Sequence, residues 1–336
     1  MIKAFCLLLC STVLACATSS ALAGPYTGIY AFGDSLSDVG NDLIISGGLV
    51  PKATIYTDGT HSGRFTNGLN YLDGLSSALG ITMVPSLAGG SDYAYGGARV
   101  NSVALPGSKS FNQQIAAYDA THVTADPKAL YVLWIGANDM GDAIQAAAGG
   151  NPGAIGAAIA SVMSAIANAI GGLASLGADH FLVPNLPDLS LTPQINSVGS
   201  PALDALAHNA TVAFNQNLEA LLAMNAFASL DIRDLDVFTD LNGIVNNPAK
   251  YGLTNTTASC YTGNVDGSAL PGGPSPPTIC ANPNQYLFWD FEHPTRVVNA
   301  ILAQDALAAV PEPPAVWTWV ALLAGLALFA PKRLRG

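Results

Sequence analysis

The sequence predicts an α/β fold in which helices cover both faces of a parallel sheet. Several short apolar runs, each bounded by turn residues, have the length and composition of buried strands. They are Tyr26–Phe32, Ala129–Ile135, Asp179–Pro184 and the less apolar Leu230–Arg233, with Ile81–Val84 or Tyr93–Tyr95 as a further candidate. Helical segments are predicted between them, over Tyr71–Leu79, Pro152–Leu176 and Pro201–Met224. Strands alternating with helices are typical of such a sheet, so a three-layer α/β/α sandwich is expected.

Residues 1–23 have the organisation of a secretory signal peptide. A positive charge near the start is followed by the mostly apolar Phe5–Ala17 and by Ala21–Ala23, a small-residue cleavage site. Cleavage there would leave Gly24 as the first residue of an exported domain. The alternative is a lipoprotein signal ending at Cys16, although the residues before that cysteine fit its pattern poorly.

Residues 311–336 also differ from the rest of the chain. Pro311-Glu312-Pro313 precedes an apolar run, Ala315–Ala330, and a basic end, Lys332–Arg335. This order resembles a PEP-CTERM sorting tail. The resemblance implies transient inner-membrane anchoring during export, cleavage near the Pro-Glu-Pro motif by an exosortase-type enzyme, and delivery to the cell surface or an extracellular polysaccharide matrix. A plain C-terminal membrane anchor is the alternative, and in both cases the basic end stays in the cytoplasm.

Residues 24–310 are long enough for one large domain or two small ones, with a sizeable core. The chain has a formal net charge of −11, which disfavours nucleic acid and anionic lipid heads as partners. Cys260 and Cys280 are the two cysteines that remain after removal of a signal peptide, and such a pair in an exported domain predicts a disulfide. It would clip residues 241–286, a Gly/Pro-rich segment interpreted as a surface insertion.

Four short motifs point to one kind of chemistry. In chain order they are Gly33-Asp34-Ser35-Leu36, Tyr95-Gly96-Gly97-Ala98, Gly136-Ala137-Asn138-Asp139 and Asp290-Phe291-Glu292-His293-Pro294. Ser35 and Asn138 each follow a predicted strand. Because ligands of parallel sheets bind at the carboxyl ends of the strands, we expect both residues on the same rim.

Together the motifs resemble the four blocks of the GDSL, or SGNH, esterase and lipase family, over most of residues 26–308. A fifth stretch, Arg64-Phe65-Thr66-Asn67-Gly68 with Asp73, resembles its lipase and phospholipase-like branch and is expected to shape the wall of the site. The resemblance implies the SGNH hydrolase fold, with a five-stranded parallel sheet in flavodoxin-like order. The family usually has Asn where this chain has Asp92, a departure at a supporting residue near Gly97.

Acyl transfer needs a nucleophile, a base, an orienting acid and donors for the developing oxyanion. Ser35 is the candidate nucleophile, His293 the base, and Asp290 the acid that orients the imidazole. The candidate oxyanion donors are the backbone N–H groups of Ser35 and Gly97 and the side-chain amide of Asn138. Each has a plainer explanation when taken alone: a helix-capping serine, a surface histidine before proline, a tight glycine turn or a loop-closing amide.

The expected function is hydrolysis of carboxylic esters of lipids or short acyl alcohols through an acyl-enzyme on Ser35, with no cofactor. Tyr286–Trp289 hint at an acyl pocket, although burial in the core explains these residues better. The alternatives are a polysaccharide O-acetylesterase, favoured by the sorting tail, and a non-catalytic matrix or adhesion protein. The sequence has no Gly-x-Ser-x-Gly elbow, which disfavours the ordinary α/β-hydrolase fold. It also has no Walker-type loop for binding phosphate and no patterned His/Cys cluster for binding a metal.

Overall fold

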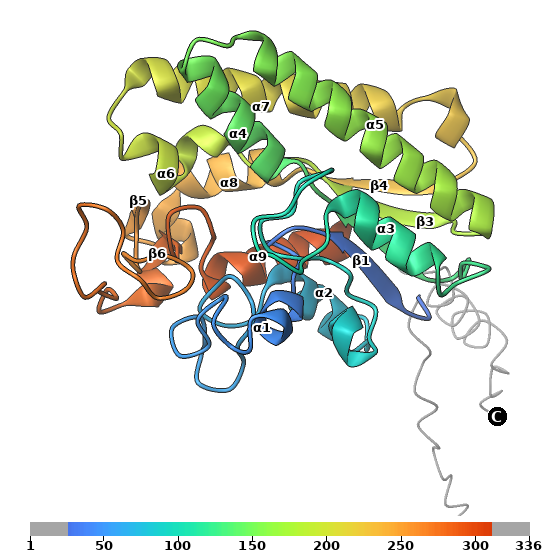
Figure 1. The fold of residues 1–336 in the computed structure, drawn as a ribbon, viewed down its shortest axis with the longest axis horizontal. Coiled ribbons are helices and arrows are strands. Elements are labelled where there is room, and N and C mark those ends of the chain that lie inside the picture. Colours follow the sequence, from blue (N-terminus) through green and yellow to red (C-terminus); the bar gives the residue numbers. More distant parts are fainter. Residues whose placement is uncertain (1–25, 311–336) are drawn as a thin grey trace, which may run out of the picture.

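A parallel sheet runs through the middle of the molecule (Figure 1). The computed structural model describes residues 26–310, so the expected signal peptide and sorting tail lie outside the described residues. The strands, in spatial order, are β1 (Ile29–Gly33), β2 (Leu130–Trp134), β3 (His180–Pro184) and β4 (Asp231–Leu235). All neighbours pair in parallel. The α/β class predicted from the sequence is therefore confirmed.

The five-stranded sheet implied by the resemblance is reduced here to four regular strands and one short edge segment. Tyr93 donates its N–H to the Ala31 carbonyl at 2.7 Å, and Ala31 donates to Ser91 at 3.1 Å, which places residues 91–95 parallel to β1 on its free side. This is the position of the expected fifth strand in flavodoxin-like order. The ladder stops because Gly96 and Gly97 turn the chain away from the sheet.

Helices cover both faces of the sheet and make the three expected layers (Figure 1). One face carries α3 (Phe111–Asp119), α4 (Ala137–Ala148), α5 (Gly153–Leu176) and α7 (Pro201–Leu222). The other carries α2 (Tyr71–Ala78) and α9 (Arg296–Ala309), with α8 (Val237–Asn246) beside them. Two further short helices are α1 (Asn41–Ile45) and α6 (Pro193–Asn196). Single 3₁₀ turns occur at Ser86–Ala88, Leu189–Leu191, Asn225–Phe227, Pro248–Tyr251 and Pro283–Gln285.

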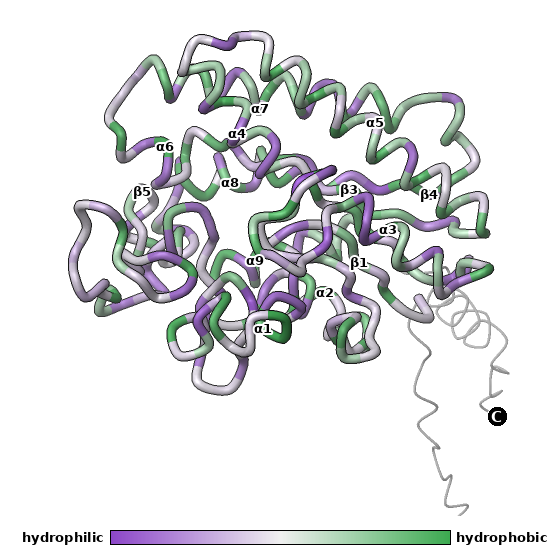
Figure 2. The backbone as a smooth tube through the Cα atoms, viewed as in Figure 1, coloured by the Kyte–Doolittle hydropathy of each residue, from purple (hydrophilic) through white to green (hydrophobic). Residues whose placement is uncertain are grey.

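Side-chain alternation along the strands fills two cores. Phe32 and Leu133 point to the α5 side, whereas Ala31 and Val132 point to the α9 side. Figure 2 shows hydrophobic residues recurring along α5, which is long and apolar enough to cross a membrane. One face of the helix, which includes Val162, Ile166 and Ile170, is buried against the sheet. The edge strand β4 is half-buried and polar, which explains its weaker sequence pattern.

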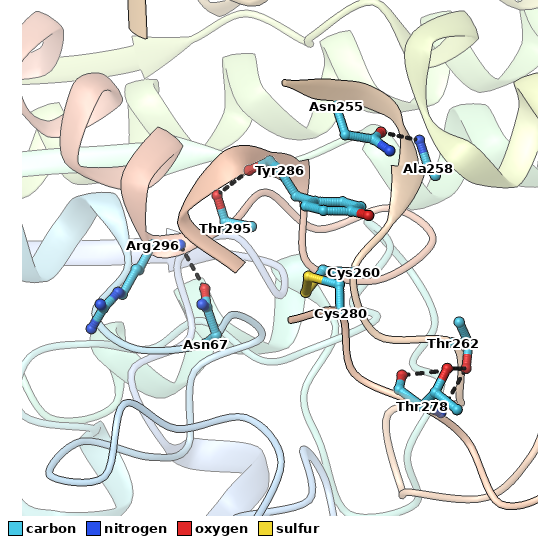
Figure 3. Close-up of a disulfide and its surroundings, with 10 residues drawn as sticks. All are labelled: Asn67, Asn255, Ala258, Cys260, Thr262, Thr278, Cys280, Tyr286, Thr295 and Arg296. Carbon is cyan, nitrogen blue, oxygen red and sulfur yellow. Dashed lines mark hydrogen bonds between the residues drawn. A yellow bond between two sulfur atoms is a disulfide. The ribbon is translucent and has the colours of Figure 1, made fainter. Parts of the chain in front are cut away.

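The segment expected to be an insertion over residues 241–286 begins later than predicted. Residues 241–246 complete α8, because Leu241 and Ile244 bury their side chains beside Leu287. The irregular part therefore begins after Asn246. It contains β5 (Asn255–Ser259), which pairs with β6 (Tyr286–Phe288). The predicted disulfide between Cys260 and Cys280 is present and clips this segment (Figure 3).

Candidate active site

Ser35 lies on a tight turn that closes directly after β1. The carbonyl oxygen of Asp34 accepts the N–H of Asp38 at 3.0 Å, and its carboxylate accepts the N–H of Leu36 at 3.0 Å. The turn leaves Ser35 at the carboxyl end of the strand, with 9% of its surface exposed. Asn138 reaches the same edge of the sheet because it lies in the first turn of α4, directly after β2.

The loop between β6 and α9 presents Asp290 and His293. Asp290 Oδ1 accepts the backbone N–H groups of Glu292 at 3.0 Å and of His293 at 2.8 Å. The His293 carbonyl accepts the N–H of Trp289 at 2.7 Å and closes the loop. Thr66 donates its hydroxyl hydrogen to the carbonyl oxygen of Pro294, the residue after His293, at 2.8 Å. The 64–73 stretch thus holds this loop in place, and Figure 3 shows its Asn67 bonded to the start of α9.

The residues predicted as nucleophile, base and orienting acid meet in one hydrogen-bonded row. Ser35 Oγ lies 2.8 Å from His293 Nε2. His293 Nδ1 lies 2.9 Å and 2.8 Å from the two carboxylate oxygens of Asp290. His293 and Asp290 are each 3% exposed, so little water competes for these bonds. Such a row can take the proton of the serine hydroxyl as its oxygen attacks a carbonyl carbon. The catalytic roles themselves stay a prediction.

Neighbouring charges decide which of these groups carries a proton. Burial lowers the pKa of His293, but the carboxylates of Asp290, Glu292 and Asp34 raise it more strongly, to about 9. Burial raises the pKa of Asp290, yet the His293 charge and the hydrogen bonds it accepts hold that pKa below its ordinary value. Asp290 is therefore ionised near neutral pH, while a growing fraction of His293 becomes neutral as the pH approaches 9. Only neutral His293 can accept the serine proton.

The candidate oxyanion donors lie around the same cavity as His293. Gly97 has φ +65°, and a Cβ added there would lie 2.5 Å from the Ala104 Cβ, so the position requires glycine. Asn138 donates one amide hydrogen to the Ala98 carbonyl at 3.1 Å, which fixes the amide and leaves its second hydrogen for a ligand. The N-terminus of α4 adds partial positive charge at this place.

The cavity has a volume of about 750 Å³ and two different sides. Its apolar side comes from α4, α6, α7, the turn between α6 and α7, and the 3₁₀ turn Leu189–Leu191. The side chains are those of Ile144, Leu189, Ile195, Val198 and Leu203. Its polar side includes Arg99, Asp142, Asn264 and Asp266, the last two from the disulfide-clipped segment. Of the residues expected at an acyl pocket or in the core, Leu287 and Trp289 are packed in core clusters. Phe288 is buried in the same core as Leu287 but also lines the cavity.

Two aromatic side chains contact the row formed by Ser35, His293 and Asp290, called the triad from here on. The Phe65 ring packs on the His293 ring, with centroids 5.3 Å apart. The Tyr56 hydroxyl donates to Asp290 Oδ2 at 2.7 Å. Phe65 belongs to the stretch expected to form the wall of the site. Tyr56 lies in no recognisable motif, so sequence reasoning missed it.

Asp92 uses both of its carboxylate oxygens. They accept the backbone N–H groups of Val39 at 2.8 Å and of Ala94 at 3.0 Å. An asparagine has a single acceptor oxygen and would turn its amide hydrogens toward one of these donors. Burial and the nearby Asp38 raise the pKa of Asp92 well above its ordinary value. The departure from the family pattern thus leaves the turn beside Gly97 hydrogen-bonded.

A family description matches residues 29–306, that of the GDSL-like lipase/acylhydrolases. This chain belongs to that family. Among residues 26–310, no group of three or more His, Cys, Asp or Glu side chains is arranged to hold a metal ion.

Relatives of the chain include enzymes of several names. It is 35% identical to Lipase 1 of Photorhabdus luminescens over 182 residues, which are 52% of this chain but 24% of that protein. It thus spans only about a quarter of that relative. It is 27% identical to a GDSL esterase/lipase of Arabidopsis thaliana, covering 84% of this chain and 85% of the relative. It is 26% identical to the phosphatidylcholine-sterol acyltransferase of Aeromonas hydrophila, covering 84% of this chain and 89% of that relative.

Proposed function

We propose that the chain is an exported esterase or lipase that hydrolyses acyl esters through Ser35. The observation that carries the proposal is the Ser35–His293–Asp290 row at the wall of a cavity with an apolar side. Neutral His293 removes the Ser35 proton while Oγ attacks the ester carbonyl. Asp290 keeps the imidazole oriented and stabilises its positive charge.

The oxyanion that forms is held by the N–H groups of Ser35 and Gly97 and by the Asn138 amide. His293 then gives its proton to the leaving alcohol, and the acyl group stays on Ser35. In the second half of the reaction His293 takes a proton from water while the water oxygen attacks the acyl carbon. The bond from that carbon to Ser35 Oγ then breaks, His293 returns its proton to Oγ, and the carboxylic acid leaves. Protons and bonds balance without any further reactant.

The shape of the cavity supports a lipid-like acyl chain as substrate. An acyl chain fits against Ile195, Val198 and Leu203, and the alcohol faces the polar side near Asn264 and Asp266. The name of the Aeromonas relative, phosphatidylcholine-sterol acyltransferase, describes an acyl transfer from a phospholipid and agrees with such a substrate. The second candidate is a polysaccharide O-acetylesterase, for which the polar side is the supporting observation.

The test is hydrolysis of p-nitrophenyl esters from acetate to palmitate by the purified protein, with Ser35→Ala and the exposed Ser175→Ala beside it. We expect Ser35→Ala to lose activity and fluorophosphonate labelling, and Ser175→Ala to keep both. No activity and no labelling in folded wild type would refute the serine mechanism and favour a non-catalytic matrix role. A strict preference for acetate, with acetate released from polysaccharide, would favour the second candidate.

A matched pair of variants tests the acyl side. Val198 is 61% exposed at the cavity wall, whereas Val123 is 92% exposed and lies outside the cavity. Val198→Trp should depress activity on long acyl chains more than on acetate, because the indole fills the chain's path. Val123→Trp should change neither. An equal effect of Val198→Trp on all chain lengths would contradict this assignment.

Export is part of the proposal and rests on the sequence of residues 1–23 and 311–336. A disulfide inside the domain agrees with an oxidising compartment. Cell fractionation, with mass spectrometry of the mature ends, would test it. We expect a start at Gly24 and, in a host that has an exosortase-type enzyme, a cut near Pro311–Pro313. An intact chain recovered from the cytoplasm would contradict export.

A further inference from the structure

Tyr56 makes a direct contact with the acidic member of the triad from a distant part of the chain. Its hydroxyl donates to Asp290 Oδ2 at 2.7 Å, across 234 positions of sequence. The side chains of both residues are buried. Burial and the negative charge of Asp290 raise the pKa of Tyr56 well above its ordinary value, so the phenol keeps its proton and acts as a donor.

The contact completes the set of donors around the Asp290 carboxylate. Oδ1 accepts two backbone N–H groups from its own loop, and His293 Nδ1 lies against both oxygens. Among residues 26–310, two side chains form hydrogen bonds with Oδ2, those of His293 and Tyr56. Without Tyr56, the contact of Oδ2 would be the imidazole alone, the group whose orientation the carboxylate has to set. A donor on the second oxygen fixes the carboxylate plane, and with it the orientation of the imidazole.

Tyr56 is itself held rigidly. Its ring packs edge-on against Tyr261 and Trp289, with centroids 5.8 Å and 6.1 Å away. Lys52, one turn earlier, donates its N–H to the Val265 carbonyl at 2.7 Å and joins this loop to the disulfide-clipped segment. Tyr261 directly follows Cys260, so the disulfide lies next to this aromatic cluster (Figure 3 shows the disulfide). A rigid donor of this kind can orient its acceptor.

We propose that Tyr56 is a positioning residue of the ester hydrolysis, acting through Asp290 on His293, a role that rests on the function proposed above. It holds the carboxylate plane and spreads part of the Asp290 charge onto the phenol. Without this donor, more charge faces the imidazole, which keeps its proton more tightly. The other charged groups that face His293 are Glu292 and Asp34, and they stay in place when the hydroxyl alone is removed.

The test compares Tyr56→Phe with Tyr131→Phe. Tyr131 is also fully buried, and its hydroxyl donates to the Asp126 carbonyl at 3.2 Å, at the end of β2 away from the site. For Tyr56→Phe we expect kcat about tenfold lower, on the scale of a charge-assisted hydrogen bond, with KM unchanged. We also expect kcat/KM to rise at a higher pH than in wild type, because His293 then loses its proton at a higher pH. Tyr131→Phe should match wild type in kcat and in the pH at which kcat/KM rises.

A double-mutant cycle provides a measurement that does not depend on stability alone. If Tyr56 acts through Asp290, Tyr56→Phe should cost much less kcat in an Asp290→Asn background than in wild type. Equal losses in both backgrounds, or an inflection that stays at the wild-type pH, would overturn the positioning role. Tyr56→Phe keeps the ring that packs against Tyr261 and Trp289, and circular dichroism of each variant reports folding. An inactive wild type would refute the proposed function instead, so the two failures are distinguishable.

Discussion

The proposed esterase activity should rise steeply between neutral and alkaline pH. Burial lowers the pKa of His293 but the surrounding carboxylates bring it to about 9, so the imidazole is mostly protonated at neutral pH. With that pKa, the neutral fraction is about 1% at about pH 7 and about 50% at about pH 9, so kcat/KM should increase roughly 50-fold. A histidine with an ordinary pKa would give an increase of only about 1.3-fold over the same interval.

The assay follows p-nitrophenyl butyrate hydrolysis at the isosbestic wavelength of p-nitrophenol, with Ser35→Ala giving the background rate. Asp290→Asn removes the main cause that raises the His293 pKa, so its inflection should move to lower pH. Its maximal kcat should fall by about 10⁴-fold, because the imidazole loses its orienting partner. Two results would refute this explanation of the His293 pKa. One is a kcat/KM of folded wild type that changes less than about twofold between about pH 7 and about pH 9, and the other is an Asp290→Asn inflection at the wild-type pH.

Three further predictions concern the oxyanion site, the buried acids and the disulfide. Asn138→Ala should lower kcat by about 10²–10³-fold with little change in stability, measured by kinetics and a thermal scan. Burial raises the pKa values of Asp34 and Asp42 to about 7, above their unfolded values, so their contribution to stability is full at acid pH and lost as pH rises through about 7. Urea unfolding should accordingly show lower stability at about pH 8 than at about pH 5, by up to about 1.4 kcal/mol per pH unit for each proton. Replacing Cys260 and Cys280 by serine should lower the free energy of unfolding by about 3 kcal/mol, visible in the same titration.

Each of these expectations has an outcome that would contradict it. Asn138→Ala with wild-type kcat would remove the amide from the oxyanion site. Asn217→Ala is its control, because Asn217 donates to a helix carbonyl on the exposed face of α7. Stability that stays constant from about pH 5 to about pH 8 would mean that the buried acids are ionised in the folded state as readily as in the unfolded one. A serine pair as stable as wild type would show that the clipped segment is held by its packing alone.

The sequence predicted those parts of the site that lie in local motifs. The Ser35 turn and the Asp290–His293 loop are short, so their residue order carries their geometry. The strands were predicted where both faces are buried, as in β2, but less clearly at the polar edge strand β4. The end of α8 was missed because Leu241 and Ile244 pack against residues more than 40 positions away.

The apolar side of the cavity and the Tyr56 contact could not be predicted from the sequence. Ile195, Val198 and Leu203 lie in separate turns and helices whose convergence is a result of tertiary packing. Tyr56 meets Asp290 only because its loop and the β6–α9 loop come together across the molecule. Neither has a residue spacing that marks it. Local pattern thus specified the reacting groups, whereas long-range packing specified what surrounds them.

The proposed nucleophile and its proposed base are separated by 258 positions, almost the whole domain. During synthesis the Ser35 turn leaves the ribosome long before the His293 loop exists. A nascent or truncated chain therefore carries the serine without the proposed base. We expect the proposed hydrolysis to begin only after α9, which follows His293 and packs against α2 in the folded structure, has been made. For a protein proposed to pass through a membrane made of acyl esters, this late completion of the site separates its synthesis from its action.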